Sequence, residues 1–338
     1  MLNLSARSIV MLAMVMCCSN FALAQERRRV VVAADGSGDF TDVQSAVDSL
    51  ASDAEPAILL IKPGTYKQIL RIGKNAPPLH FIGGGKDPSE TVLTFDMYAN
   101  SIIPPATQPV GTSGSSSTVI DSKDFIAENL TFENNAGQAA QAVAIKVMND
   151  RHIFRNCRFI GWQDTLCADS GRQYYFNCYI EGRVDFIFGG ATAVFDRCTI
   201  HSINGGYITA ARTKPHLPFG YVFLDCTLTG EGEPAFLGRP WQWDRGSNAS
   251  VTFIRTRMGD HIRPEGWNPW HLKDKQNTDP ASVTRYAEFG SMNLRGDRLD
   301  VSKRVDWSRQ LTAEEAAAIT IPSVLAGDDG WDPTATPR

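Results

Sequence analysis

Apolar residues along this chain fall in short runs bounded by polar and turn-forming residues, and long stretches of helical periodicity are absent. Residues 30–33 and 58–61 predict strands near the start of the chain. Between them, residues 41–44 (TDVQ) predict a capping box that opens a short helix. Residues 312–315 (TAEE) predict a second capping box and an Ala-rich helix. The Gly, Asp and Pro residues from 327 onward predict a loosely packed terminus.

A seven-residue pattern repeats through the middle of the chain. Residues 126–132 match residues 153–159 position by position. Three related segments follow, at residues 174–180, 194–200 and 222–228. Measured from Leu130 through the cysteines of the later segments, the intervals are 27, 21, 20 and 28 residues. Short β-rich repeats with variable loops are typical of the stacked coils of a parallel β-helix. The long amphipathic helices of a βαβ fold are absent, so we expect one all-β solenoid domain with short N- and C-terminal helices.

The start of the chain has the features of an export signal. Arg7 provides a positive n-region, residues 9–17 an apolar core, and Ala22 and Ala24 a small-residue cleavage site. The apolar run is shorter than the roughly 20 residues that span a bilayer, so we expect no membrane span. A lipoprotein anchored through Cys17 or Cys18 is the alternative, which the bulky residue before Cys17 disfavours. We therefore expect residues 1–24 to be removed and the mature domain, residues 25–338, to be secreted or periplasmic.

Composition and charge exclude several classes of protein. Hydrophobic residues make up 43% of the 338 residues, too many for a disordered chain. Removing residues 1–24, which hold one Arg and no acidic residue, takes the net charge from −4 to −5. No basic patch points to nucleic acid as a partner. The negative balance would mildly repel an ionised polyanion and would repel a neutral, esterified stretch of the same polymer less.

Five cysteines follow the expected signal: Cys157, Cys167, Cys178, Cys198 and Cys226. An odd number in an exported protein leaves at least one thiol free. Cys178 and Cys198 occupy equivalent positions one coil apart, and the strand spacing fits the Cα separation of a disulfide. A ladder of small buried thiols is the alternative. No CxxC pattern occurs, so we expect no zinc site.

Asp164 and Asp185 are the strongest candidates for chemistry. Each lies in an otherwise apolar or aromatic stretch, and 21 residues, one coil of the repeat, separate them. The solenoid would therefore place both carboxylates on one face, a few ångströms apart. Two ionised carboxylates at that range repel, so one pKa should rise and the other stay low, giving a general acid and a nucleophile. A single Asp in a solenoid more often caps a turn, but a pair in coil register favours catalysis.

Polar and aromatic neighbours add to this pair. Gln141 and Gln163 lie 22 residues apart, again about one coil, and a carboxamide N–H can donate to a developing oxyanion. A ladder of buried glutamines is the alternative. Arg239, beside Pro and Trp, can hold a carboxylate ionised. Flat faces for sugar rings are offered by Trp241, Trp267 and Trp270, and Trp267 lies in a Gly-flanked loop where we expect exposure.

Four ordered motifs resemble those of the pectin methylesterase family: QAVA at residues 141–144, QDTL at 163–166, DFIFG at 185–189 and LGRPW at 237–241. Residues 35–46 (DGSGDFTDVQSA) are similar to the start of the family's catalytic domain, and the resemblance covers residues 30–331. It implies a right-handed parallel β-helix that removes methyl esters from polygalacturonate without a metal or cofactor. We expect methyl-esterified polygalacturonate as the partner, no nucleic acid and no membrane, and a monomer.

The resemblance also implies roles for single residues. Asp185 matches the nucleophile and Asp164 the general acid/base. Gln141 matches the oxyanion donor, Gln163 lies beside the intermediate, and Arg239 matches the partner of the nucleophilic carboxylate. The positions that match aromatic residues of the substrate cleft are Phe188, Trp241 and Trp267.

Two departures from the family pattern leave the substrate open. Gln68 stands where the family's GxYxE has its Glu, and Cys167 follows QDTL where Tyr is usual. A same-fold esterase or thioesterase for another acyl group is therefore one alternative. A pectate or pectin lyase is another, although lyases use an Arg or Lys base, commonly with calcium held by several acids, and the motifs offer no such cluster. A non-catalytic polysaccharide-binding solenoid is the third. A serine hydrolase is disfavoured because no GxSxG elbow occurs.

Overall fold

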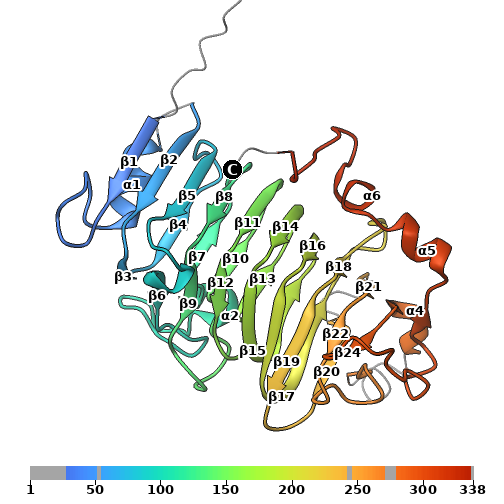
Figure 1. The fold of residues 1–338 in the computed structure, drawn as a ribbon. Coiled ribbons are helices and arrows are strands. Elements are labelled where there is room, and N and C mark those ends of the chain that lie inside the picture. Colours follow the sequence, from blue (N-terminus) through green and yellow to red (C-terminus); the bar gives the residue numbers. More distant parts are fainter. Residues whose placement is uncertain (1–27, 52–54, 242–245, 271–278, 336–338) are drawn as a thin grey trace, which may run out of the picture.

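The computed structural model describes residues 28–51, 55–241, 246–270 and 279–335, and within them the chain winds into stacked coils (Figure 1). The expected signal segment lies outside the described residues. Strands at the same position of successive coils pair in parallel, so each coil adds to both sheets. Two neighbouring parallel strands must be joined by a crossover connection, and here the remainder of one coil forms that connection. No helix of the described residues is long and apolar enough to cross a membrane.

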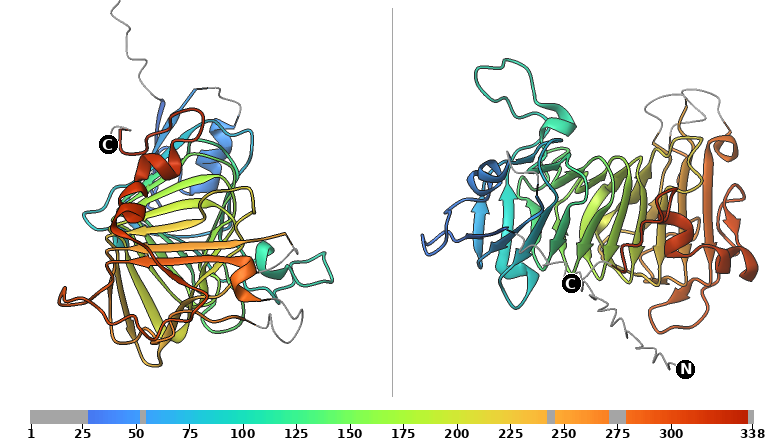
Figure 2. Two further views of the ribbon diagram at one scale, coloured as in Figure 1. Left: turned by 90° about the vertical axis from the view of Figure 1, so that its right-hand side faces the viewer. Right: turned by 90° about the horizontal axis from the view of Figure 1, so that it is seen from above.

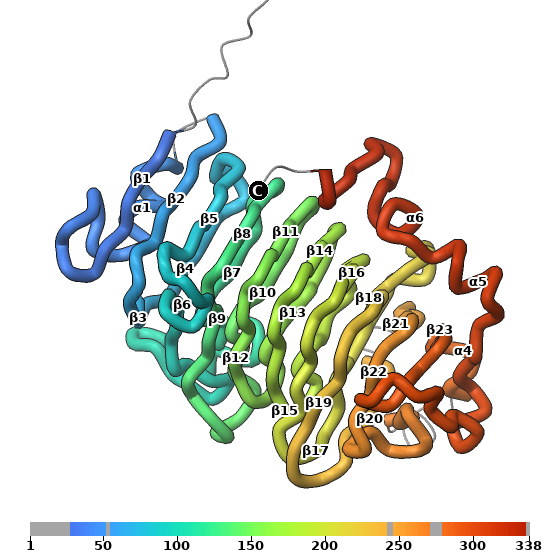
Figure 3. Tube along the Cα trace, in the orientation of Figure 1, coloured from blue at the N-terminus to red at the C-terminus, as the bar shows by residue number. Residues whose placement is uncertain are grey.

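One sheet has 11 strands and runs the length of the stack. In order they are β1 (Arg28–Val32), β2 (Ala57–Ile61), β5 (Leu79–Gly83), β8 (Ile126–Glu128), β11 (His152–Arg155), β14 (Arg172–Phe176), β16 (Thr192–Asp196), β18 (Tyr221–Leu224), β21 (Ala249–Ile254), β23 (Thr284–Phe289) and β25 (Arg309–Gln310). In the tube of Figure 3 they follow one another in sequence order across the picture, from the blue end on the left to the orange-red end on the right.

A 14-stranded sheet forms the rest of the wall. Its main path is β3 (Gly64–Lys67), β6 (Thr91–Phe95), β9 (Thr131–Asn134), β12 (Arg158–Ile160), β15 (Tyr179–Gly189), β17 (Thr199–Ala211), β19 (Thr227–Glu231), β22 (Arg257–Met258) and β24 (Met292–Asn293). A side branch holds β4 (Leu70–Ile72), β7 (Thr118–Ile120), β10 (Ile145–Val147) and β13 (Leu166–Ala168), and β20 (Ala235–Gly238) pairs with β17. The long strand β15 pairs with β12 of the main path and with β13 of the side branch, and its pairing with β17 shifts register between Gly182 and Ile187.

The seven-residue repeat of the sequence marks one corner of each coil. The residue at its fourth position has a left-handed backbone in Asn129, Asn156, Asn177, Arg197 and Asp225, with φ between 51° and 57°. Asn and Asp adopt this conformation more readily than other non-glycine residues. Asn156 Nδ2 donates to Asn129 Oδ1 at 2.9 Å, so the corners also bond to one another. The repeat therefore encodes the turn between the two sheets.

The interior of the stack is a ladder of aromatic rings. Phe154, Tyr175, Phe195, Phe223 and Phe253 stack face to face, with centroids 4.9, 4.7, 4.5 and 4.4 Å apart. These spacings match the separation of neighbouring strands, which is why one ring per coil fills the core without gaps.

Cysteines form a second internal ladder. All five described cysteines are buried and free, so the disulfide considered for Cys178 and Cys198 is absent. The thiols of the four in the ladder instead donate to backbone carbonyls of the coil before, as Cys178 Sγ does to Phe154 O at 3.5 Å and Cys198 Sγ to Tyr175 O at 3.4 Å. The small thiol serves here as a buried apolar side chain.

The helices of the described residues are all short. They are α1 (Val43–Leu50), a 3-10 turn at Pro88–Glu90, α2 (Gly111–Gly114), α4 (Pro280–Val283), α5 (Ala313–Ala318) and α6 (Ile321–Leu325). The predicted capping box of α5 is confirmed. That of α1 is wrong: Asp42, not Thr41, caps the helix, and Gln44 instead accepts from Arg71 N at 2.7 Å, tying α1 to β4.

The C-terminal segment runs back along the outside of the 11-stranded sheet (Figure 1). Asp329 pairs with Arg151 at 2.9 Å and with Arg172, and the Arg172 guanidinium lies 5.5 Å from the Trp331 ring. Arg155 Nη2 donates to Pro333 O at 3.0 Å. The prediction of a loosely packed terminus is therefore wrong, because arginines of successive coils bind it.

Candidate active site

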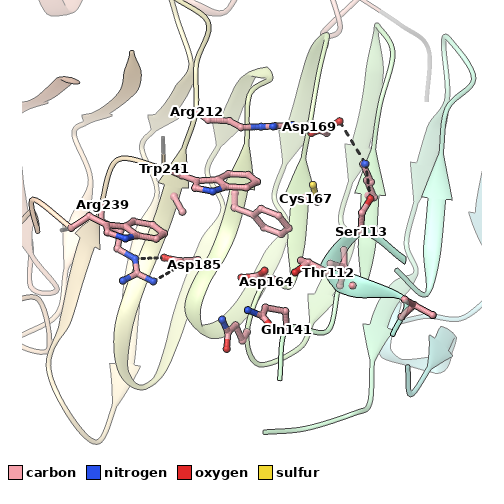
Figure 4. A pocket seen from close by; sticks show the side chains of 18 residues that line it. Thr112, Ser113, Gln141, Asp164, Cys167, Asp169, Asp185, Arg212, Arg239 and Trp241 are labelled. Atoms are coloured by element: carbon pink, nitrogen blue, oxygen red, sulfur yellow. Dashed lines mark hydrogen bonds and ion pairs between the residues drawn. The ribbon is translucent and has the colours of Figure 1, made fainter. Parts of the chain in front are cut away.

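A cavity of about 590 Å³ opens on the side of the stack where β10, β13, β15 and β17 follow one another. Figure 4 shows its side chains arriving from successive coils. Seen from above, the long loop that holds α2 stands out from the coils (Figure 2), and its residues 110–113 form part of the cavity wall. Seven of the eight residues expected to form the site line this cavity: Gln141, Gln163, Asp164, Asp185, Phe188, Arg239 and Trp241.

Asp164 and Asp185 face the cavity from adjacent coils. Gln163 and Val184 form a parallel bridge, and Asp164 N donates to Val184 O at 3.0 Å, so the two aspartates are the next residues of each coil. Both have left-handed backbones, with φ of 65° and 52°, and both are only 7% exposed. Strained, buried polar residues of this kind concentrate at functional sites.

Arg239 binds one of the two carboxylates. Its Nε and Nη2 donate to the two oxygens of Asp185 at 2.8 and 2.7 Å. The guanidinium is held between two rings, 3.9 Å from the centroid of Tyr207 and 3.7 Å from that of Trp270. The bidentate geometry and the stacking on both faces fix the arginine, which in turn fixes the orientation of the Asp185 carboxylate.

The two carboxyl groups differ in the interactions that counteract the effect of burial on their pKa values. Burial raises the pKa of Asp164 well above its usual value, and the charge of Asp185 raises it further. Burial also raises the pKa of Asp185, but the hydrogen bonds and charge of Arg239 lower it. The expectation that one pKa stays low is wrong, because burial outweighs Arg239 and leaves the pKa of Asp185 raised as well. Because Arg239 bonds only Asp185, a proton shared by the pair is favoured on Asp164.

The two glutamines lie beside these carboxyls. Ala142 N donates to Gln163 O at 3.0 Å, which places Gln141 and Gln163 at neighbouring positions of adjacent coils. Both are half-buried and line the cavity, and Figure 4 shows Gln141 close to Asp164. Their carboxamides are therefore available to an oxygen atom bound near the aspartates.

Aromatic side chains line one wall, but not all those expected. Phe188 is 4% exposed, and its ring centroid lies 5.6 Å from that of Trp241. Trp267 is only 1% exposed and stacks on Tyr286 at 4.1 Å in the core. The expectation of an exposed Trp267 is wrong: its backbone bridges Gly238, and its side chain lies in the core, 5.9 Å from the ring of Phe253 in the aromatic ladder.

Comparison with known proteins identifies the family. A sequence model of the family described as Pectinesterase matches residues 29–328. The chain belongs to the pectinesterase family. Pectinesterase 31 of Arabidopsis thaliana is 41% identical over 297 residues, which cover 86% of this chain and 89% of that protein. Pectinesterase 2 of Olea europaea is 35% identical over 308 residues, covering 86% and 77%.

Solved pectin methylesterases share the fold. The carrot enzyme superimposes with a TM-score of 0.77 at 29% identity, covering 89% of this chain and 93% of that one. A pectin methylesterase in complex with a hexasaccharide gives 0.77 at 30% identity, covering 90% and 98%. PemA of Erwinia chrysanthemi gives 0.75 at 29%, covering 92% and 99%. The predicted fold class, a right-handed parallel β-helix, is confirmed.

Of the two residues that depart from the pectinesterase pattern, one lies outside the cavity and the other lies on its wall. Gln68 does not line the cavity; its side chain accepts from Gln44 N at 3.1 Å and supports α1. Cys167 does line it, 5% exposed, and burial raises the pKa of its thiol well above the usual value. The thiol therefore stays protonated and offers an apolar wall rather than a nucleophile.

Sequence reasoning missed five polar residues of the cavity: Thr112, Ser113, Lys146, Asp169 and Arg212. The pairing of successive coils could have revealed three of them. Lys146 and Phe188 both pair with Cys167, so they form one row across the coils. Asp169 and Arg212 each lie two residues after a member of this row. Thr112 and Ser113 belong to the loop that holds α2, and no repeat marks them. Among the described residues, no group of three or more His, Cys, Asp or Glu side chains could hold a metal ion.

Proposed function

We propose that this protein hydrolyses the methyl esters of homogalacturonan and releases methanol and pectate. Its membership of the pectinesterase family supports the reaction, and a related pectin methylesterase binds a hexasaccharide. The observation that carries the proposal is a pair of buried carboxyls in one cavity, only one of which is bound by an arginine.

Acylation uses the two aspartates in different protonation states. The ionised Asp185 attacks the ester carbonyl carbon, and the carbonyl oxygen becomes an oxyanion that accepts an N–H from the Gln141 carboxamide. Gln163 lies beside this tetrahedral intermediate. When the intermediate collapses, Asp164 gives its proton to the methoxy oxygen and methanol leaves, so that Asp185 carries the acyl group.

Deacylation returns the site to its starting state. Asp164, now a carboxylate, takes a proton from a water molecule, whose oxygen attacks the acyl carbon. Asp185 leaves as a carboxylate, which Arg239 stabilises through its two hydrogen bonds. The product leaves as a galacturonic acid unit, which loses its proton to the solvent, and Asp164 is protonated again.

Phe188 and Trp241 would form the wall against which the polymer lies, since flat apolar rings suit the faces of sugars. Trp267 has no place in this wall because it is buried in the core. We further propose that residues 25–338 act as one monomeric catalytic domain, exported to the periplasm or the extracellular space after cleavage following Ala24.

The test is to incubate the purified protein with highly esterified pectin and measure methanol and unsaturated uronate together. Methanol without absorbance from an unsaturated product supports the proposal. Unsaturated product would instead show a lyase. Pectin binding without either product would show a non-catalytic polysaccharide-binding solenoid, and turnover confined to a simple acyl ester would show an esterase for another substrate.

A further inference from the structure

A long loop leaves the coils beside the catalytic cavity and returns to them. It lies between β6 and β7, over residues 96–117, and it holds α2 (Figure 2). Its middle, residues 102–109, is exposed, whereas residues 110–113 form part of the cavity wall. The loop meets the coils at residues 97–99 and 115–117, which we name the loop feet.

The segment that carries Gln141 belongs to no strand. Residues 141–144 come directly before β10 and have no regular secondary structure. On one side the following coil holds them, because Ala142 N donates to Gln163 O at 3.0 Å. On the other side a loop foot holds them, because Ala99 N donates to Gln141 O at 2.8 Å. The backbone position of Gln141 therefore depends on the loop feet.

One buried side chain ties both loop feet to this segment. Asn134, the last residue of β9, is only 3% exposed. Its Nδ2 donates to Met97 O at 2.8 Å in the first foot and to Ser115 O at 3.1 Å in the second. The same Nδ2 donates to Val143 O at 3.1 Å, two residues after Gln141. A single carboxamide thus joins the two loop feet to the segment of the proposed oxyanion donor.

The chemistry of asparagine suits this position. Its amide nitrogen carries two hydrogens and can donate to several carbonyl oxygens that surround it. Its Oδ1 accepts from Ala136 N at 3.1 Å, which fixes the direction of the amide group. An aspartate of the same size would present oxygen atoms to three carbonyl oxygens, and burial of its charge without a partner would be costly. The position therefore needs the N–H donor and not only the shape of the side chain.

A serine of the second loop foot completes the network. Ser115 is fully buried, and its Oγ accepts from Val143 N at 3.2 Å. The same hydroxyl donates to Thr112 O at 2.6 Å, and Thr112 lines the cavity. Both backbone polar groups of Val143 are thus held by residues of this network, which connects the cavity wall to the backbone beside Gln141.

We propose that Asn134 is a positioning residue, which holds the backbone at Gln141 so that the Gln141 carboxamide reaches the developing oxyanion. The inference rests on the proposed function, in which Gln141 donates to that oxygen atom. Asn134 does not line the cavity, so it acts through Gln141 and not on the substrate. A donor stabilises the transition state only when it lies within hydrogen-bonding distance of the oxyanion, so a small displacement of Gln141 should lower kcat.

The experiment is a double-mutant cycle that measures kcat for methanol release from highly esterified pectin. We expect Gln141→Ala to lower kcat by about 10²-fold, the effect of removing an oxyanion donor. Asn134→Ala should lower kcat by about tenfold in the wild-type background, because it displaces that donor. In the Gln141→Ala background it should lower kcat by less than about twofold, since the group that it positions is absent. A merely structural role would lower kcat by the same factor in both backgrounds.

Gln173→Ala is the matched control. Gln173 is also a fully buried carboxamide, but its Nε2 donates to Val147 O at 3.1 Å and to Ser170 O at 2.9 Å rather than to the loop feet. Like Asn134→Ala, this variant should lower the urea concentration at the midpoint of unfolding, because buried carbonyls lose their donor. Unlike Asn134→Ala, it should leave kcat within about twofold of wild type.

If Asn134→Ala does not fold, Ser115→Ala decides. It removes only the hydroxyl that binds Val143 N and Thr112 O, and it should lower kcat by about threefold in the wild-type background but not in the Gln141→Ala background. Equal factors in the two backgrounds would overturn the inference. Wild-type kcat in Gln141→Ala would refute the oxyanion role of Gln141 and the inference with it, and a wild-type protein that releases no methanol would refute the proposed function.

Discussion

Asp164 and Asp185 stand at equivalent positions of adjacent coils, each one residue beyond the bridge that joins Gln163 to Val184. Both have left-handed backbones and are 7% exposed, yet only Asp185 is bound by Arg239. The repeated coils thus place two aspartates in the same conformation and burial. Arg239, from a later coil, then gives them different electrostatic surroundings. The division into an acid and a nucleophile depends on this asymmetry.

Replacing Asp164 should stabilise the folded protein as pH rises. Burial raises the pKa of this carboxyl, so the folded chain binds its proton more tightly than the unfolded chain does. Its contribution to stability is complete below the unfolded pKa of about 3.9 and is lost as pH rises through the raised folded pKa. Asp164→Asn removes that loss, and we expect it to gain about 1 kcal/mol over wild type between pH 4 and pH 7.

Denaturant titrations of both proteins at a series of pH values measure this effect. Asp225→Asn, an exposed partner of Arg255, is the control and should stay within about 0.5 kcal/mol of wild type. A difference between Asp164→Asn and wild type that does not grow with pH would contradict the raised pKa.

Arg239→Lys should shift the acid limb of the pH–rate profile to higher pH. Arg239 lowers the pKa of Asp185 against the effect of burial, and lysine keeps the charge but loses the bidentate bonds and the stacking between two rings. Asp185 must be ionised to attack, so kcat/KM on the acid side should fall by about tenfold or more. An acid limb at the wild-type position would show that Arg239 does not tune this carboxylate.

Much of this arrangement can be predicted from the sequence because the repeat encodes it. The fourth position of the seven-residue pattern marks the corner of each coil, and the interval of 21 residues between the aspartates equals one coil. Contacts between side chains of coils that are not adjacent were not predicted. Arg212 donates to Asp169 two coils away across Gly190, and no local pattern reports such a pair.

Two errors share a cause. Trp267 lies beside glycine, and the C-terminal segment is rich in Gly, Asp and Pro, so composition predicts exposure for both. In the structure, Trp267 stacks on Tyr286 and the C-terminal segment binds Arg151 and Arg172. Partners aligned by the stacking of coils decide burial here, and local composition does not reveal them.

Trp331→Ala should weaken the attachment of the C-terminal segment. The Trp331 ring packs against the apolar cluster outside the 11-stranded sheet and lies 5.5 Å from the Arg172 guanidinium. Its loss should lower the free energy of unfolding by about 2 kcal/mol, measured by denaturant titration. Leu294→Ala, at a side chain 49% exposed, should change it by less than about 0.5 kcal/mol. Equal effects of the two variants would mean that the segment adds nothing to stability.

Methanol release by Asp185→Asn on highly esterified pectin tests the central claim most directly. The variant should keep the fold and bind pectin, because asparagine matches the size of aspartate, but it has no carboxylate to attack the ester. We expect the rate of methanol release to fall by about 10³-fold or more. Asp225→Asn should release methanol at the wild-type rate. A folded Asp185→Asn variant within about tenfold of wild type would contradict the role of Asp185 as the nucleophile.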